Sequence, residues 1–347
     1  MAERRRNRRG IPAAAPAPWS PMTEDLVIGI DVGGTNMRSA LVDPRGRIVL
    51  QSRTATGAWL EGRETARRLI EECRSLRLAA SGFGAAVRAA GLGVAGRIDP
   101  REGRVVFSPN LPRMNGYPLA AELRTALDLP VVMLNDADCF GIGESRLGAG
   151  RSIPNWVGLT LGTGVGGCLV LDNHLWTGDN LGFAGEIGHM IVVPGGRPCA
   201  CGARGCLEAY ASGRALVEGF LEAAATGAPV AGIEQRPLEP AKVAARDVHR
   251  LALQGDPLAR EVFRRMGWAI GLALSNCFTV LGVRHAVIGG GVSAGWDQFE
   301  GALVVSLAEH ATMFEAADAV IRRGVLGDDA APLGAALAAW RQLGHGA

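Results

Sequence analysis

Lysine is almost absent from this chain of 347 residues, in which Lys242 is the only one among 36 basic residues. A P-loop kinase needs a lysine directly after its glycine-rich loop, so that mechanism is excluded. The formal net charge is only +2, so no overall basic field supports nucleic-acid binding, and we expect none. No uninterrupted apolar run reaches the roughly 18 residues of a membrane span, and no membrane association is expected.

The N-terminal residues lack the apolar core of a secretion signal, being arginine-rich and then rich in proline and alanine. Their five arginines could contact nucleic acid, but we favour a solvated, disordered tail over residues 1–25. Four scattered cysteines lie in apolar or helical surroundings and are expected to be buried, reduced thiols, namely Cys73, Cys139, Cys168 and Cys277. Reduced thiols are typical of a cytoplasmic protein.

The length suggests two domains. Short apolar runs predict strands, and longer segments predict helices. The expected strands are 26–31, 37–42, 48–54, 91–95, 131–134, 156–161, 168–171 and 285–288, and the expected helices are 61–87, 137–147 and 332–343. Twice, at 33–35 and at 162–167, a glycine turn joins two strands into a hairpin, which is a weak internal repeat. The pattern predicts an α/β protein with a hairpin opening each half.

The first glycine turn follows a carboxylate at the end of a strand and precedes an arginine on the next one. This set can place Mg²⁺ near the aspartate and phosphate oxygens on the turn, the hydroxyl and the arginine. The residues are Asp31, Gly33, Gly34, Thr35 and Arg38.

The second turn, Gly162-x-Gly164-x-x-Gly167, matches the dinucleotide fingerprint. A strand at 168–171 follows it where that fingerprint needs a helix, so we reject a dinucleotide-binding domain. A hairpin whose N–H groups face an anion remains open, with Thr163 at its tip. A triple glycine at Gly289, Gly290 and Gly291 follows a later strand.

Asn135 and Asp136 stand at the carboxyl end of a buried strand, where α/β folds place ligands and catalytic groups. Asp136 could instead be the N-cap of the helix at 137–147. Position alone favours the cap.

A cluster of soft ligands occurs within 18 residues: His189, Cys199, Cys201 and Cys206. Three thiolates and an imidazole suit a closed tetrahedral Zn²⁺ site. Glu186 and Glu208 bracket this cluster, so the metal would fix a loop that presents two acids.

Together these motifs resemble the ROK family (repressors, open reading frames and sugar kinases). Residues 31–38 and 161–167 look like its two phosphate motifs, and 185–189 with the cysteine cluster is similar to its signature and zinc site. The resemblance implies the actin-like, hexokinase-like ATPase fold, with two ribonuclease H-like domains and a cleft between them. The small domain would comprise 26–134 plus 331–347, and the large domain 135–330. A homodimer or homotetramer is also implied.

The resemblance assigns roles to residues. Asp136 would be the catalytic base of an ATP-dependent kinase that uses Mg²⁺ and holds a structural Zn²⁺. Sugar hydroxyls would bind Asn110, Asn135, Asp136, Glu186, His189 and Glu208, with His189 serving zinc as well. ATP would bind Asp31, Gly33, Gly34, Thr35, Arg38, Gly162, Thr163 and Gly164, and the glycines at 289–291 would pass beside the adenosine.

The resemblance favours phosphorylation of the 6-hydroxyl of glucose. Two departures leave an N-acetylglucosamine or N-acetylmannosamine kinase, or a fructokinase, as alternatives. Met114 stands where many glucokinases of the family carry tryptophan, and Cys139-Phe140 is similar to its N-acetylhexosamine kinases. A sugar-responsive repressor would need a helix-turn-helix domain, and about 25 residues before Leu26 are too few for one.

Overall fold

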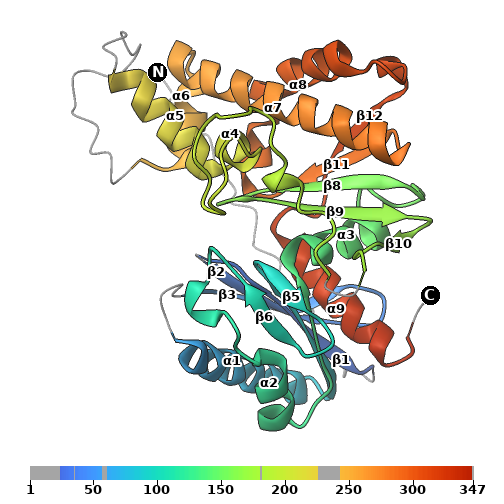
Figure 1. The fold of residues 1–347 in the computed structure, drawn as a ribbon. Helices are drawn as coiled ribbons and strands as arrows, with labels where there is room; N and C mark the ends of the chain where they lie inside the picture. Colours follow the sequence, from blue (N-terminus) through green and yellow to red (C-terminus); the bar gives the residue numbers. More distant parts are fainter. Residues whose placement is uncertain (1–23, 35, 57–60, 180–181, 226–242, 346–347) are drawn as a thin grey trace, which may run out of the picture.

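The computed structural model describes residues 24–34, 36–56, 61–179, 182–225 and 243–345. Within these ranges two five-stranded sheets form the two halves of the molecule, one below and one above in Figure 1. Two expectations lie outside the described residues: the structure of the tail at 1–23 and the position of Thr35.

The first sheet has the strand order β3-β2-β1-β4-β7. Its central strand pairs antiparallel with β2 and parallel with β4, so the predicted glycine hairpin is confirmed. All seven residues of this central strand are buried, because helices cover both faces of the sheet. The strands are β1 (Leu26–Val32), β2 (Asn36–Val42), β3 (Ile48–Ala55), β4 (Val87–Val94) and β7 (Val131–Asn135), with a separate ribbon of β5 (Arg97–Asp99) and β6 (Arg104–Phe107).

Different helices cover the two faces of this sheet. On one face, α1 (Gly62–Gly82) and α2 (Leu119–Leu127) pack over a core of aliphatic side chains. On the other, α9 (Ala330–Gln342) crosses β1 and β4 so closely that glycine is required beneath it. A Cβ on Gly29 would lie 2.0 Å from the Pro332 carbonyl oxygen, and one on Gly91 would lie 1.9 Å from that of Ala335.

The second sheet repeats the same order of pairing, as β10-β9-β8-β11-β12. Its first hairpin is antiparallel, and the next two strands are parallel. The weak repeat read from the two glycine turns is therefore confirmed as a repeat of topology. The strands are β8 (Trp156–Leu161), β9 (Val165–Leu171), β10 (His174–Leu175), β11 (His285–Gly289) and β12 (Val320–Arg323).

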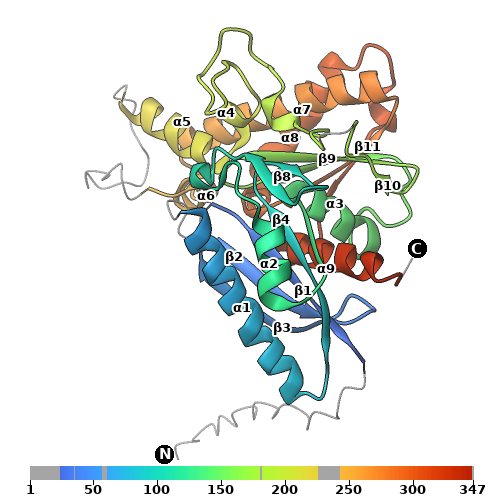
Figure 2. The same cartoon turned by 60° about the horizontal axis from the view of Figure 1, so that its bottom comes forward.

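Helices gather above this second sheet, as Figures 1 and 2 show. They are α4 (Glu208–Ala211), α5 (Gly213–Ala225), α6 (Ala245–Leu253), α7 (Pro257–Leu281) and α8 (Trp296–His310). Short 3₁₀ segments occur at Pro112–Met114, Ile187–His189, Gly291–Gly295, Ala316–Asp318 and Gly327–Asp329. None of the helices in the described ranges is long and apolar enough to cross a bilayer.

Helices α3 (Asp136–Leu147) and α9 lie side by side between the two sheets. Glycines let their backbones touch, since a Cβ on Gly334 would lie 1.7 Å from the Cys139 carbonyl oxygen. The fully buried carboxylate of Glu144 accepts hydrogen bonds from the backbone N–H groups of Ala149 (2.6 Å) and Leu326 (3.0 Å). This acid ties α3 to the chain that enters α9.

The boundaries of one expected helix were wrong. The segment 61–87 was predicted as one helix, but α1 ends at Gly82 and β4 already begins at Val87. Gly84 adopts φ +76°, which a helix does not allow. The four scattered cysteines are free and buried, as expected. The division of the chain into two domains remains a proposal, because α3 packs on both sheets.

Candidate active site

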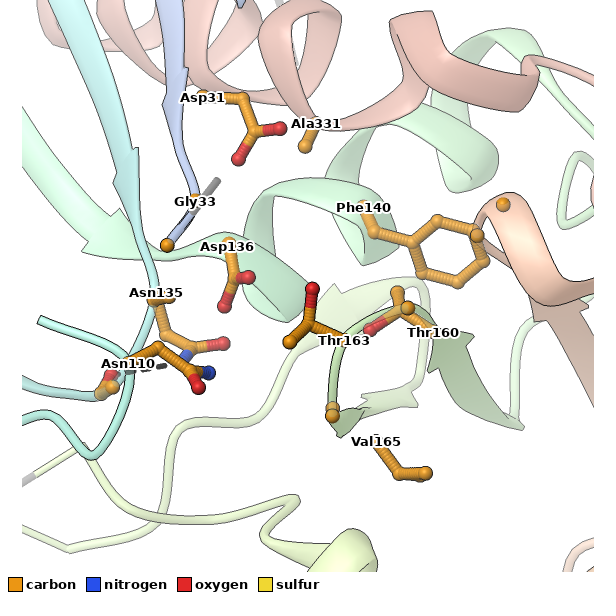
Figure 3. Close-up of a pocket in the computed structure, with 18 of the residues that line it drawn as sticks. Asp31, Gly33, Asn110, Asn135, Asp136, Phe140, Thr160, Thr163, Val165 and Ala331 are labelled. Carbon is orange, nitrogen blue, oxygen red and sulfur yellow. Dashed lines mark hydrogen bonds between the residues drawn. The ribbon is translucent and has the colours of Figure 1, made fainter. Parts of the chain in front are cut away.

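A cleft of about 310 Å³ opens where the two glycine hairpins meet. Asn110, Asn135 and Asp136 lie together on one side of it, with Thr160 and Thr163 on the other (Figure 3). Most of the predicted residues line this one cavity: Asp31, Gly33, Gly34, Arg38, Asn110, Asn135, Asp136, Gly162, Thr163, Gly164, Glu186, His189, Glu208, Gly290 and Gly291. The sequence motifs therefore converge in space.

The first hairpin brings a buried acid and an arginine to the cleft. Asp31 and Arg38 are direct partners across the β1–β2 pair, with Arg38 Nη1 3.4 Å from Asp31 Oδ2. Burial, reinforced by the nearby Asp136, raises the pKa of Asp31 to about 7, although Arg38 opposes the shift. A cation beside Asp31 would relieve this cost, so the site fits Mg²⁺.

Asn135, and not Asp136, is the N-cap of α3. Its Oδ1 accepts hydrogen bonds from the N–H groups of Ala137 (2.8 Å) and Asp138 (3.2 Å), while its Nδ2 donates to the Gly96 carbonyl (2.8 Å). The expectation that Asp136 caps the helix was therefore wrong. The reason is local geometry, since Asn135 has the extended conformation of a cap residue.

Asp136 is left free of capping and lines the cleft. Its surroundings shield most of it from solvent and raise its pKa to about 6. The backbone N–H groups of Ala137 and Asp136 itself work against this shift, and Glu186 adds to it. A carboxyl with a pKa near 6 is ionised at neutral pH and remains a good proton acceptor.

The second hairpin rests on a carboxylate from another part of the chain. Glu208 Oε2 accepts a hydrogen bond of 3.0 Å from the Val165 N–H. A Cβ on Gly164 would lie 2.3 Å from the same oxygen, so a side chain here would displace the carboxylate. Arg214 Nη2 lies 3.6 Å from the other oxygen, Oε1. Glu208 is thereby held at the tip of the hairpin, with only 8% of its surface exposed.

The predicted zinc ligands also come together. The ligand atoms of His189, Cys199, Cys201 and Cys206 all lie within 4.8 Å of one another. Zn–S bonds of about 2.3 Å in a tetrahedron separate two sulfur atoms by about 3.8 Å. The Sγ atoms of Cys201 and Cys206 are 3.7 Å apart, and Nδ1 of His189 is 3.6 Å from Sγ of Cys199. These spacings fit a tetrahedral zinc.

His189 faces two ways. Nδ1 is the ring nitrogen turned to the cysteines, while Nε2 lies 4.0 Å from Glu186 Oε2 in the cleft. The histidine therefore has one nitrogen available for a metal and one for a ligand in the cleft. Burial raises the pKa of Glu186, and the neighbouring His189 lowers it.

A larger cavity of about 800 Å³ adjoins the cleft and shares Gly162, Thr163 and Gly291 with it. Apolar side chains such as Leu216 and Val292 line it. It offers a place for a flat apolar group attached to phosphates at the hairpins. Among the predicted nucleotide glycines, Gly289 lines neither cavity, because it lies in β11 against the ring of Phe140.

Several lining residues were not predicted. Thr160 and Ala331 line the cleft, and so does Asp328, whose Oδ2 lies 2.8 Å from Arg38 Nη2. A Gly-Asp-Asp sequence at 327–329, just before the last helix, was the available signal for Asp328.

Two of the three residues suspected of setting sugar preference do not reach the cleft. Met114 is 1% exposed in the core of the first sheet, and Cys139 is fully buried. Met114 belongs to the core beneath α1 and α2, and the Cys139 thiol lies against Gly93 of β4. Only Phe140 lines the cleft.

Comparison with known proteins gives consistent matches. The model of the ROK family matches residues 27–342. A glucokinase from Thermotoga maritima is 34% identical over 89% of this chain and 96% of its own length. An N-acetyl-D-glucosamine kinase from Yersinia pseudotuberculosis is 30% identical over 77% of this chain and 84% of its own. A crystal structure of a ROK family glucokinase from Streptomyces griseus, in complex with glucose and AMPPNP, has a TM-score of 0.78 at 32% identity and covers 91% and 99% of the two chains.

Proposed function

The chain belongs to the ROK family, and we propose that it is an ATP-dependent kinase that phosphorylates the 6-hydroxyl of glucose. It has the actin-like, hexokinase-like ATPase fold that the sequence predicted. One observation carries the proposal: both glycine hairpins, a carboxyl poised near neutrality and a ring of polar side chains converge on one cleft.

Asp136 would act as the general base. A sugar hydroxyl is a weak nucleophile, and removing its proton as the phosphoryl group arrives assists the transfer. A base with a pKa of about 6 is ionised before the sugar binds. Its position in the first turn of α3 also favours the anion, because the N–H groups there point toward it.

The polar ring would select which hydroxyl meets Asp136. A hexose carries several hydroxyls of similar reactivity, so orientation must be fixed by several contacts at once. Asn110, Glu186, His189 and Glu208 all line the cleft beside Asp136. Asn135 already uses its carbonyl for two backbone bonds and one N–H for Gly96. It can therefore offer only its remaining N–H to a sugar.

ATP would lie across the two hairpins. Phosphate oxygens would meet the N–H groups of the glycine turns and Arg38, with Mg²⁺ near Asp31. The adenosine would occupy the larger cavity, which begins at Gly162, Thr163 and Gly291. Thr35 remains a predicted phosphate ligand, and Gly289 would contribute through packing of β11 on Phe140.

The cysteine cluster would hold a structural zinc. The metal would fix the chain from His189 to Glu208 and so set the orientation of His189 Nε2 and of the Glu208 carboxylate. We further propose that 26–134 with 331–347 and 135–330 close on each other when sugar binds, which would exclude water as a competing acceptor. We propose a cytoplasmic location and a homodimer or homotetramer, as the family suggests.

An N-acetylglucosamine or N-acetylmannosamine kinase is the second candidate. Phe140 supports it, because this aromatic ring lines the cleft and stands in the segment similar to N-acetylhexosamine kinases. A fructokinase is the weaker alternative, with no feature of the cleft in its favour.

The test is release of ADP from Mg-ATP over glucose, mannose, fructose, N-acetylglucosamine and N-acetylmannosamine, compared by kcat/KM in zinc-replete protein. We expect glucose to be preferred. A preference for an N-acetylhexosamine would transfer the proposal to the second candidate. No turnover with any of the five sugars would contradict it.

A further inference from the structure

A third large cavity, of about 870 Å³, lies at the C-terminal ends of α3 and α9, and we call it the distal cavity. It borders both halves of the molecule, with Leu134 of β7 on one side and Leu175 of β10 on the other. The elements that line it include α3, α9 and β10, which lie near one another in Figure 1. No residue lines both this cavity and the cleft among those described.

The lining of the distal cavity is positively charged and suits an anionic ligand. Its lining includes Arg45, Arg146 and Arg341 together with His174 and His345. No aspartate or glutamate occurs among the described residues that line it. A cavity with several cationic groups and no carboxylate concentrates negative ligands.

Two of these arginines are uncommitted. Arg45 has a distant partner, with Nη2 3.8 Å from Glu24 Oε1. Within the described ranges no side-chain ion pair or hydrogen bond engages Arg146 or Arg341, and both residues are exposed. A guanidinium offers parallel N–H donors that match two phosphate oxygens. Both arginines, which line the same cavity, can therefore bind a phosphate without giving up an existing ion pair.

The walls supply the rest of a small-molecule site. Leu134, Ile142 and Leu337 are apolar, so a ligand would need an uncharged portion beside its anionic one. Two buried donors in the same walls lack a partner in the described structure: the Ser145 hydroxyl and the indole N–H of Trp340. Unsatisfied buried donors are rare in folded proteins.

The distal cavity is mechanically linked to the cleft. Helix α3 begins in the cleft at Asp136 and carries Arg146 in its last turn. Helix α9 has Ala331 in the cleft and Arg341 near its end. The two helices are in backbone contact between these points, at Gly334 and Cys139. A ligand that holds their far ends can therefore shift Asp136.

We propose that the distal cavity is an effector site for a small phosphate monoester, bound by Arg146 and Arg341, whose occupancy changes the affinity of the cleft for its sugar. The effector role is separate from the proposed kinase activity, because binding in the distal cavity is a property of the folded chain and does not require turnover.

The probe is glycerol 1-phosphate, titrated calorimetrically into the zinc-loaded full chain with Mg²⁺ and AMPPNP present to fill the phosphate positions of the cleft. We expect saturable binding that is weakened about tenfold or more in the double variant R146A/R341A, because the variant lacks both guanidinium contacts to the phosphate; a tenfold loss corresponds to about 1.4 kcal/mol. The matched control is R67A/R68A, which also removes two exposed arginines but on α1. It should bind as the unchanged protein does.

Binding that is absent, or equal in R146A/R341A and the control, would overturn the site. Inorganic phosphate is titrated in parallel and should bind more weakly, since it lacks a portion for the apolar wall; equal affinity would overturn the assignment to a monoester. The single variant R341A serves if the double variant melts at a lower temperature. Finally, the glucose Kd should differ with and without saturating probe, and an unchanged Kd would overturn the effector role.

Discussion

The hairpins β1–β2 and β8–β9 occupy the same place in two sheets of identical strand order, yet they carry different chemistry. The next-to-last residue of the central strand is Asp31 in β1 and Thr160 in β8. Asp31 faces Arg38 across its hairpin, whereas Thr160 faces Gly166, which has no room for a side chain beside that hydroxyl. The first hairpin is charged, and the second is small and neutral.

The second hairpin obtains its charge from elsewhere. Glu208 comes from the segment 189–208 that holds the candidate zinc ligands, and it accepts a hydrogen bond from the Val165 N–H at the hairpin's tip. The repeated scaffold thus supplies the same geometry to both hairpins, while the acidic groups come from β1 and the first turn of α3 beside the first hairpin and from the segment 189–208 beside the second. Under the proposed function, such a division would let phosphates lie against neutral glycine amides and would keep acids beside the sugar and the metal ion.

Two aspartates near the starts of α3 and α9 show a similar contrast. Asp136 stands directly after β7 of the first sheet, and Asp328 stands between β12 of the second sheet and α9, which packs back on the first sheet. Both line the cleft. Asp136 is withdrawn from solvent and has a raised pKa, while Asp328 is half exposed and forms an ion pair with Arg38. Burial, rather than position alone, distinguishes Asp136 from Asp328 and supports its proposed role as the base.

The largest expected effect separates these two aspartates. D136N should lower kcat by about 10²–10⁴-fold while glucose still binds, because it removes the proton acceptor and keeps the shape. D328N is the matched control and should change kcat no more than about fivefold, the effect of an exposed ion pair. Steady-state kinetics and a glucose titration of both variants measure this. An equal loss of kcat in D136N and D328N would mean that the two aspartates share the role of the base.

The next largest effect concerns the segment from His189 to Glu208. C206S should release zinc and abolish measurable glucose binding, because His189 and Glu208 would lose their fixed positions. C277S replaces a cysteine outside the cluster and should keep both zinc and glucose affinity. Zinc content by mass spectrometry of the intact protein is measured alongside the glucose Kd. Glucose binding by a zinc-free C206S protein would show that the loop holds its acids without a metal.

A smaller effect compares the two hairpins directly. G164A places a methyl 2.3 Å from Glu208 Oε2, whereas G34A places one 3.1 Å from the Asn110 carbonyl oxygen. Overpacking costs about 1–3 kcal/mol, so the glucose KM of G164A should rise by about 5- to 150-fold. G34A should raise it less, since a shift of a few tenths of an ångström relieves its contact. A greater rise in G34A would contradict the view that the second hairpin depends on Glu208.

The sequence predicted most of this arrangement, since apolar strands and glycine turns have local signatures. The hairpins, the cluster of candidate zinc ligands and most cleft residues could be identified because each motif is short and contiguous. What could not be predicted depended on contacts between distant segments. Asp328 meets Arg38 only after α9 returns to the first sheet. Met114 and Cys139 are packed in the core, which motif comparison does not reveal.

The cap of α3 illustrates a different limit. Asn135 and Asp136 are adjacent and both suit a cap, so propensity does not choose between them. Backbone geometry does, because β7 delivers Asn135 in an extended conformation with Gly96 opposite its amide. The outcome is functional as well as structural: once asparagine caps the helix, the aspartate is left free for the cleft.

The smallest expected effect is the change in the free energy of unfolding that follows from the raised pKa of Asp136. The pKa of Asp136 is raised from 3.8 to about 6, so the folded protein holds this proton more tightly than the unfolded chain does. Its contribution to stability is therefore present below about pH 4 and lost as the pH rises through 6. D136N avoids the loss and should be more stable than the unchanged protein at pH 8, but not at pH 4. At about 1.4 kcal/mol for each pH unit, the gain is at most about 2–3 kcal/mol, since the cleft leaves the carboxyl some solvent.

D328N, which loses an ion pair, should show no gain. Urea denaturation of the three proteins at both pH values measures the difference. A D136N protein that is no more stable at pH 8 would mean that the carboxyl is better solvated than its place in the cleft implies.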